Sequence, residues 1–86
     1  MQFDRKFSPV VETLVLRRIE PERAIARYYS LVVERDLFGR TVLVRQWGRI
    51  GTHGRELVEE HLSEDEALKA MEILAKAKRR RGYCDL

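Results

Sequence analysis

The sequence is poor in the features that mark metal centres, covalent cross-links and membrane spans. Cys84 is the only cysteine among 86 residues, so neither an intramolecular disulfide nor a cysteine-based zinc site can form. No run approaches the roughly 18–20 apolar residues that cross a bilayer, and the first residues lack the apolar segment of a secretory signal. We therefore expect a cytoplasmic protein without membrane contacts.

Recognisable catalytic sets are also missing. The sequence shows no nucleophile with a base and an orienting group, no paired acids that imply a cleft, and no phosphate-cradling loop ahead of a helix. His53 and His61 have no further ligands near them, so we expect solvated histidines rather than a metal site. These absences favour a binding module over an enzyme, with no metal and no cofactor.

Acidic residues are absent from one stretch and concentrated in the next. No Asp or Glu occurs between Leu37 and Arg55, whereas residues 56–66 hold six acids and no Lys or Arg. The net charge of +3 is modest, but this separation predicts one basic and one acidic face. The basic face would attract a polyanion.

Apolar periodicity predicts one α+β domain at residues 12–86, preceded by a flexible arm at residues 1–11. An antiparallel sheet of about four strands is expected, because short β-branched runs are separated by turn signals. A single helical turn is expected at Pro21, and a turn at Asp36-Leu37-Phe38-Gly39 is expected to join the middle strands. The expected strands cover residues 12–19, 27–35, 40–47 and 55–62.

Alternation assigns faces to the strands. In the second strand Tyr29, Leu31 and Val33 share one side. In the third, we expect the two valines, Val42 and Val44, to face the core. Arg45 and Trp47 then emerge together on the outer side, about 7 Å apart. The alternative is a core tryptophan. The fourth strand is expected to be anchored by Leu57 and Leu62.

One long C-terminal helix is expected to cover a face of this sheet. Ser63 and Glu66 form a capping box, and Gly82 provides a natural stop after Arg81. An apolar stripe at helical spacing, extended by the stem of Lys78, indicates the buried side. Its members are Ala67, Ala70, Met71, Leu74 and Ala75.

The stretch Arg45-Gln46-Trp47-Gly48-Arg49-Ile50-Gly51 places an aromatic ring among cations. Arginines bind phosphates, and an exposed ring stacks on a base with roughly 1–3 kcal/mol per stacked base. The glycines Gly48 and Gly51 allow another backbone or a phosphate to approach closely. The alternative interpretation is a buried tryptophan beside a solvated arginine without a binding role.

This stretch, preceded by Tyr28-Tyr29-Ser30-Leu31 and followed by a helix ending in Arg81-Gly82-Tyr83, resembles the WGR domain. The family occurs in DNA-break-responsive poly(ADP-ribose) polymerases and as small bacterial proteins. The resemblance implies that Trp47 packs on a terminal nucleotide and Arg49 engages the backbone, with Gly48, Gly51 and Arg45 beside them. The catalytic domain and zinc modules of the polymerases are not part of this likeness.

A second group of candidate phosphate contacts lies at the end of the expected helix, at Lys78, Arg79, Arg80 and Arg81. Its alternative role is to complement the helix dipole. The expected partner is nucleic acid, DNA rather than RNA, bound by a monomer. The rival interpretation is a protein-protein interaction module of the same fold without direct nucleic-acid binding.

Overall fold

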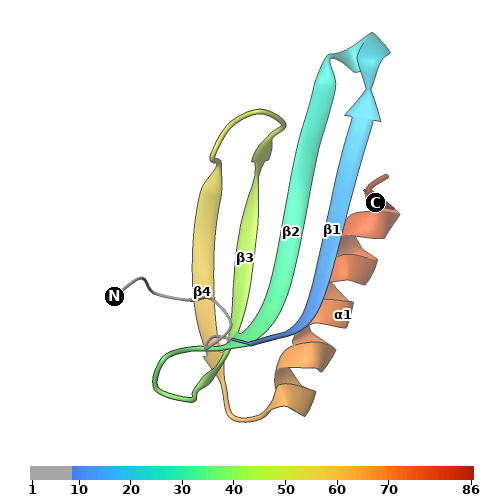
Figure 1. The fold of residues 1–86 in the computed structure, drawn as a ribbon. Helices are drawn as coiled ribbons and strands as arrows, with labels where there is room; N and C mark the ends of the chain where they lie inside the picture. Colours follow the sequence, from blue (N-terminus) through green and yellow to red (C-terminus); the bar gives the residue numbers. More distant parts are fainter. Residues whose placement is uncertain (1–8) are drawn as a thin grey trace.

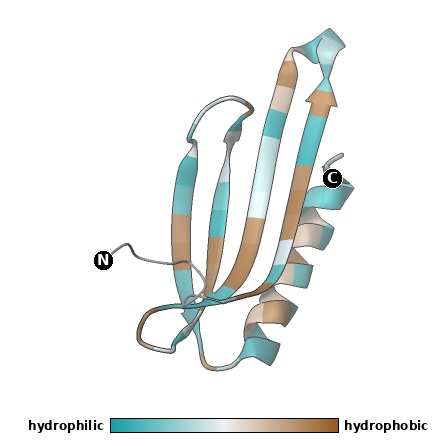
Figure 2. Ribbon diagram, in the orientation of Figure 1, coloured by the Kyte–Doolittle hydropathy of each residue, from teal (hydrophilic) through white to brown (hydrophobic). Residues whose placement is uncertain are grey.

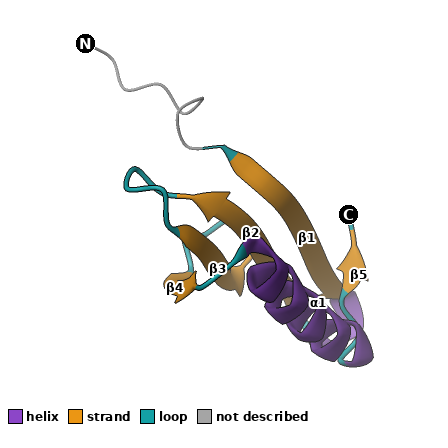
Figure 3. Cartoon of the chain, turned by 90° about the horizontal axis from the view of Figure 1, so that it is seen from below, coloured by secondary structure: helices purple, strands orange, loops and turns teal. Residues whose placement is uncertain are grey.

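The computed structural model describes residues 9–86 and shows one antiparallel sheet with a helix on one face (Figures 1 and 3). The strand order is β4-β3-β2-β1-β5, which confirms the predicted α+β class. The expected arm lies largely outside the described residues, and β1 begins at Val10. The elements are β1 (Val10–Glu20), β2 (Ile25–Arg35), β3 (Thr41–Arg49), β4 (Arg55–His61), α1 (Glu64–Arg80) and β5 (Cys84–Asp85).

The connections between the first three strands follow from local chemistry. A 3-10 turn at Pro21–Arg23 joins β1 to β2, and Ala24 closes it in the left-handed region at φ 55°. Between β2 and β3, the carboxylate of Asp36 accepts hydrogen bonds from the backbone N–H groups of Phe38 and Arg40 at 2.9 Å. Both turns were predicted, because proline and aspartate favour these conformations independently of the rest of the fold.

The core lies between the sheet and α1. Tyr29, Leu31 and Val33 of β2 share one face, as alternation predicted, and this face is the buried one, toward the helical stripe. Ala67 and Met71 are buried on α1, while the other apolar members of the stripe are buried or partly buried against them. No helix within residues 9–86 is long and apolar enough to cross a membrane.

Both ends of α1 are fixed by hydrogen bonds. The Ser63 hydroxyl accepts from the backbone N–H of Glu66 at 3.1 Å. At the other end Gly82 has φ 97°, its N–H donates to the carbonyl of Arg79, and the N–H of Tyr83 donates to that of Lys78. This pair of bonds is a Schellman motif, which satisfies the last carbonyls and turns the chain back. Tyr83 consequently enters the core.

The predicted face of the third strand was wrong. Leu43, not the valines, points at α1, and it is fully buried in the core cluster. Arg45 and Trp47 share its face, so they lie on the helix side rather than the outer side. The sequence offered apolar residues on both faces, and only the position of α1 decides which face becomes the core.

The predicted anchors of β4 were also wrong. Leu57 is 42% exposed and Leu62 is 93% exposed. The reason is that β4 is an edge strand (Figure 1), and α1 packs mainly over β1, β2 and β3. β4 is therefore held mainly by its hydrogen bonds to β3.

Candidate nucleic-acid interface

Trp47 lies near the end of β3, close to where α1 ends. Its register partners are Tyr29 on β2 and Arg55 on β4, and opposed residues of an antiparallel pair point to the same face. The Trp47 and Tyr29 rings stack with centroids 5.9 Å apart and planes at 18°. Because Tyr29 is buried, it fixes the Trp47 ring from one side, while the indole itself remains half-buried.

Tyr83 and Lys78 extend this aromatic group. The Tyr83 ring meets Tyr29 edge-on, with centroids 6.5 Å apart, and the Lys78 Nζ lies 4.4 Å from the Tyr29 centroid and 5.5 Å from that of Tyr83. Such ring contacts favour an ammonium ion. The pKa of Lys78 nevertheless falls below its usual value, chiefly because the group is partly buried and also because Arg81, Arg45 and Arg27 repel a further positive charge.

These side chains surround an open hollow of about 780 Å³, which we call the Trp47 hollow. No carboxylate of residues 9–86 lines it, although Asp and Glu are frequent in this chain. Its wall is therefore part aromatic and part cationic. The lining residues are Arg27, Tyr29, Trp47, Gly48, Arg49, Arg55, Lys78 and Tyr83.

The cations of the Trp47 hollow lack acidic partners. Within residues 9–86, no carboxylate lies within 4.0 Å of the side-chain nitrogens of Arg27, Arg49, Arg55 or Lys78. Arg27 and Arg49 are direct cross-strand neighbours, an arrangement of like charges that destabilises a sheet. A bound anion would remove this repulsion, which makes the hollow chemically suited to a phosphate.

The turn after β3 is folded back onto the opposite face of the sheet. The Tyr28 hydroxyl donates to the carbonyl of His53 at 2.7 Å, and the Gln46 side-chain amide donates to the same carbonyl at 2.9 Å. A Cβ on Gly48 would meet Gly54 Cα at 2.7 Å, so the strand and the turn touch because both positions are glycine. This contact fixes the end of β3, including the backbone that carries Trp47 and Arg49.

Four of the sequence-predicted residues line the Trp47 hollow, namely Trp47, Gly48, Arg49 and Lys78. Arg45 lies behind the ring: its Cζ is 5.8 Å from the Trp47 centroid, and its Nε donates to the Tyr29 hydroxyl at 3.0 Å. Arg45 also pairs with Glu59 at 3.5 Å. Its contacts are those of a residue that orients the aromatic pair.

The remaining predicted residues lie outside the hollow. Gly51 is in the exposed turn with φ 94°. Arg79 donates two hydrogen bonds of 2.8 Å to the carboxylate of Asp85, which ties the short strand β5 to α1. Arg80 and Arg81 are exposed beyond the lining. The four consecutive cations therefore point in different directions, as expected when 100° separates successive helical residues.

Sequence reasoning missed Arg27, Tyr29, Arg55 and Tyr83 as parts of the site. Arg55 was counted only in the acid-free stretch around Trp47, and either Tyr28 or Tyr29 was expected to add aromatic surface near Trp47, without a choice between them. The pairing register of the strands would have placed these residues in the site. Arg55 lies beside Trp47 because the turn between β3 and β4 sets that register. A register of this kind is not visible in any single segment.

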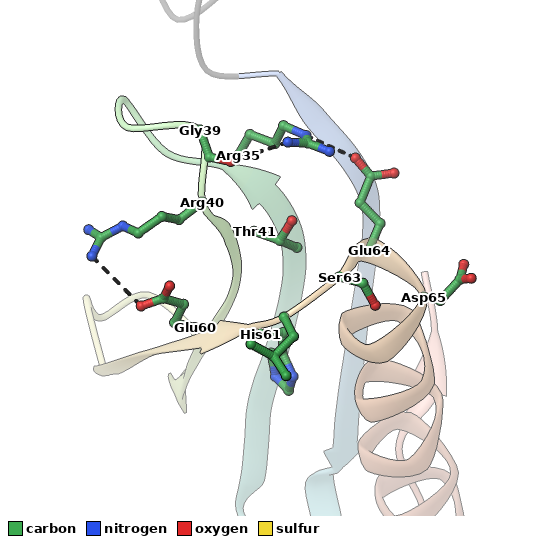
Figure 4. Close-up of a pocket in the computed structure, with 10 residues that line it drawn as sticks. Arg35, Gly39, Arg40, Thr41, Glu60, His61, Ser63, Glu64 and Asp65 are labelled. Atoms are coloured by element: carbon green, nitrogen blue, oxygen red, sulfur yellow. Dashed lines mark hydrogen bonds and ion pairs between the residues drawn. The ribbon is translucent and has the colours of Figure 1, made fainter.

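A second hollow, of about 520 Å³, lies where α1 begins (Figure 4). There Arg40 pairs with Glu60 at 3.7 Å and Arg35 with Glu64 at 3.0 Å, so positive and negative groups alternate around it. The buried Nε2 of His61 has no hydrogen-bond partner among the described residues. This balance of charge makes the second hollow a poorer polyanion site than the Trp47 hollow.

Comparison with known proteins identifies the class of domain that this geometry represents. The family model of the WGR domain matches residues 12–86, so the chain belongs to the WGR family, as the resemblance predicted. It is also similar to the uncharacterized protein y4dW of Sinorhizobium fredii (strain NBRC 101917 / NGR234), with 43% identity over 70 residues. That match covers 81% of this chain and 34% of the relative, so the chain spans about a third of the relative's length.

Proposed function

We propose that this WGR domain is a non-enzymatic module that binds nucleic acid, DNA in preference to RNA, at the Trp47 hollow. The observation that carries the proposal is the convergence of unpaired cations on one supported indole ring. In this arrangement Trp47 stacks on a terminal base or sugar, and Arg49, Arg27, Arg55 and Lys78 neutralise phosphates. Recognition of this kind depends on backbone charge and an exposed stacking surface, and it reads no base edges.

The expected affinity follows from the number of phosphates. If each of the four lining cations neutralises one phosphate, log K falls with log salt at a slope of roughly −3 to −4. Non-specific dissociation constants of about 10⁻⁴ to 10⁻⁶ M are then expected at physiological salt. This range suits a module that adds to the binding of other segments or proteins.

Fluorescence anisotropy of labelled DNA tests the proposal. Blunt, nicked and 5′-phosphorylated duplexes are titrated at two salt concentrations and compared with single-stranded DNA and RNA. Arg49→Gln should weaken binding to every nucleic acid and reduce the salt slope by about 1.

Arg23→Gln is the matched control, because Arg23 lies in the exposed turn after β1 and pairs with Glu20 at 3.3 Å. It should leave affinity and slope nearly unchanged. Absence of salt-dependent binding to all the nucleic acids would refute the proposal and favour the protein-protein interaction alternative.

A further inference from the structure

The face of the sheet opposite α1 has a different chemistry from the Trp47 hollow. Because opposed residues share a face, Val32, Val44 and Val58 form one row across β2, β3 and β4. Val42 lies in the next row of this face, between Glu34 and Glu60. We call this surface the valine face, and its members are Val32, Val42, Val44, Val58, Glu34, Glu56 and Glu60.

The valine face is hollowed and accessible in part: Val42 is only 6% exposed, while Val32 and Val44 are half-buried. A depression of about 440 Å³ lies over it, and Val58 is 55% exposed at its edge. In Figure 2 a hydrophobic stretch of β4 lies between hydrophilic segments, and Figure 3 shows α1 on the other side of the sheet. Apolar surface next to acids on a sheet face that α1 leaves open is typical of an interaction site.

The charge of the valine face is negative. Among residues 9–86, four carboxylates and a single guanidinium, that of Arg40, line the depression. Arg40 pairs with Asp36 at 2.8 Å and with Glu60 at 3.7 Å. Glu34 and Glu56 have no ion pair within residues 9–86. Two carboxylates are thus available to a partner.

This charge narrows the class of partner. A nucleic acid or an anionic lipid surface would be repelled by the carboxylates. A second copy of the chain, placed face to face, would bring glutamates against glutamates, and such like-charge contacts oppose association. A cationic protein segment with an apolar side would be complementary to both the valines and the unpaired acids.

We propose that the valine face docks a cationic amphipathic helix of a partner protein. The strands β2 and β4 flank β3 at about 5 Å each, so the face is roughly 10 Å wide, which matches the diameter of a helix. The helix lies along β3 with its apolar stripe on Val44 and on the exposed Val58, which is paired with Val44, while the buried Val42 lies beneath it. Its basic residues reach Glu34 on one side and Glu56 on the other.

The two binding surfaces are on opposite sides of the sheet, so docking does not depend on the nucleic-acid proposal. Trp47 and Arg49 point to the side of α1, whereas Val44 and Val58 point away from it. A bound helix and a bound duplex therefore do not compete. The domain would join a basic partner protein to nucleic acid.

An NMR titration of the whole chain with a defined probe tests the docking proposal. The probe is a peptide of about 14 residues, roughly four helical turns, with leucines at helical spacing and lysines elsewhere. A second peptide has glutamates in place of the lysines. The lysine peptide should shift the amide signals of Val42, Val44 and Val58, and the glutamate peptide should not.

Two double variants separate a specific site from general charge attraction. Glu34→Gln with Glu56→Gln should weaken the binding of the lysine peptide roughly two- to tenfold, the range expected for the loss of two exposed ion pairs. Glu12→Gln with Glu22→Gln makes the same change in net charge at exposed sites away from the valine face and should have little effect. The proposal would be overturned if both double variants lost the same peptide affinity, or if the shifted signals were confined to α1 or Trp47. A dimer found by sedimentation of the chain without peptide would also overturn it.

Discussion

Replacing Gly54 by alanine should be the most destabilising single methyl addition in the turn after β3. Gly54 has φ 67°, and a Cβ there would collide with the Trp47 carbonyl and lie 2.5 Å from the Tyr28 hydroxyl oxygen. The substitution therefore combines an unfavourable backbone conformation with a collision. The turn must lift from the sheet to relieve it.

Glycines elsewhere in the chain separate the two contributions. Gly39 has φ 79° with no atom within 4 Å of an added Cβ, so Gly39→Ala measures the conformational cost alone, about 1–2 kcal/mol. Gly48 has an ordinary strand conformation, and its Cβ meets Gly54, so Gly48→Ala measures overpacking alone, about 1–3 kcal/mol. Gly54→Ala should cost about 3–5 kcal/mol, because the Tyr28 and Gln46 hydrogen bonds to the turn are lost as well.

Thermal unfolding measures the three variants in parallel. For a domain of this size, 1 kcal/mol corresponds to about 4–8 °C in Tm. Gly39→Ala is then expected to lower Tm by roughly 5–10 °C and Gly54→Ala by roughly 15–30 °C. Equal losses in these two variants would show that the turn does not rest on β3, and the account of how Trp47 and Arg49 are positioned would fail.

Three further predictions concern the site and its supports. Trp47→Phe should keep the stack on Tyr29 and most of the stability. Trp47→Ala should weaken duplex binding by about 1–3 kcal/mol, and it should also lower the unfolding free energy measured in urea. Because phosphate favours the charged amine and the pKa of Lys78 is lowered, binding should weaken as pH rises through that pKa, at a lower pH than for an ordinary lysine. Lys78→Arg should abolish this dependence in anisotropy titrations. The hydrogen bond from Arg79 lowers the pKa of Asp85 below 3.8. The stability that this ion pair contributes is therefore present above that value and is lost as pH falls through the lowered pKa. An acid titration of the unfolding free energy should lack this loss in Asp85→Asn.

Much of the fold was predictable because its signals are local. The Ser63 cap, the stop at Gly82 and the turn at Asp36 each depend on a few adjacent residues, and each was placed correctly. The alternation of β2 was equally clear, since only one of its sides is consistently apolar. Local chemistry of this kind does not require knowledge of the rest of the chain.

The site was less predictable because it depends on register and on the position of α1. Val42 and Leu43 are both apolar, so alternation alone leaves the buried side of β3 undecided. The approach of Arg27 and Arg55 to Trp47 requires the pairing of three strands. Tyr83 reaches Tyr29 only because the Schellman motif reverses the chain.

Amide and indole chemical-shift mapping with a short 5′-phosphorylated duplex is the most direct measurement of the central claim. The account predicts that the largest changes occur at the Trp47 indole and at the amides of Gly48, Arg49 and Arg55, while the signals of Val44 and Val58 remain in place. Changes centred on the valine face, or none at any duplex concentration, would contradict it.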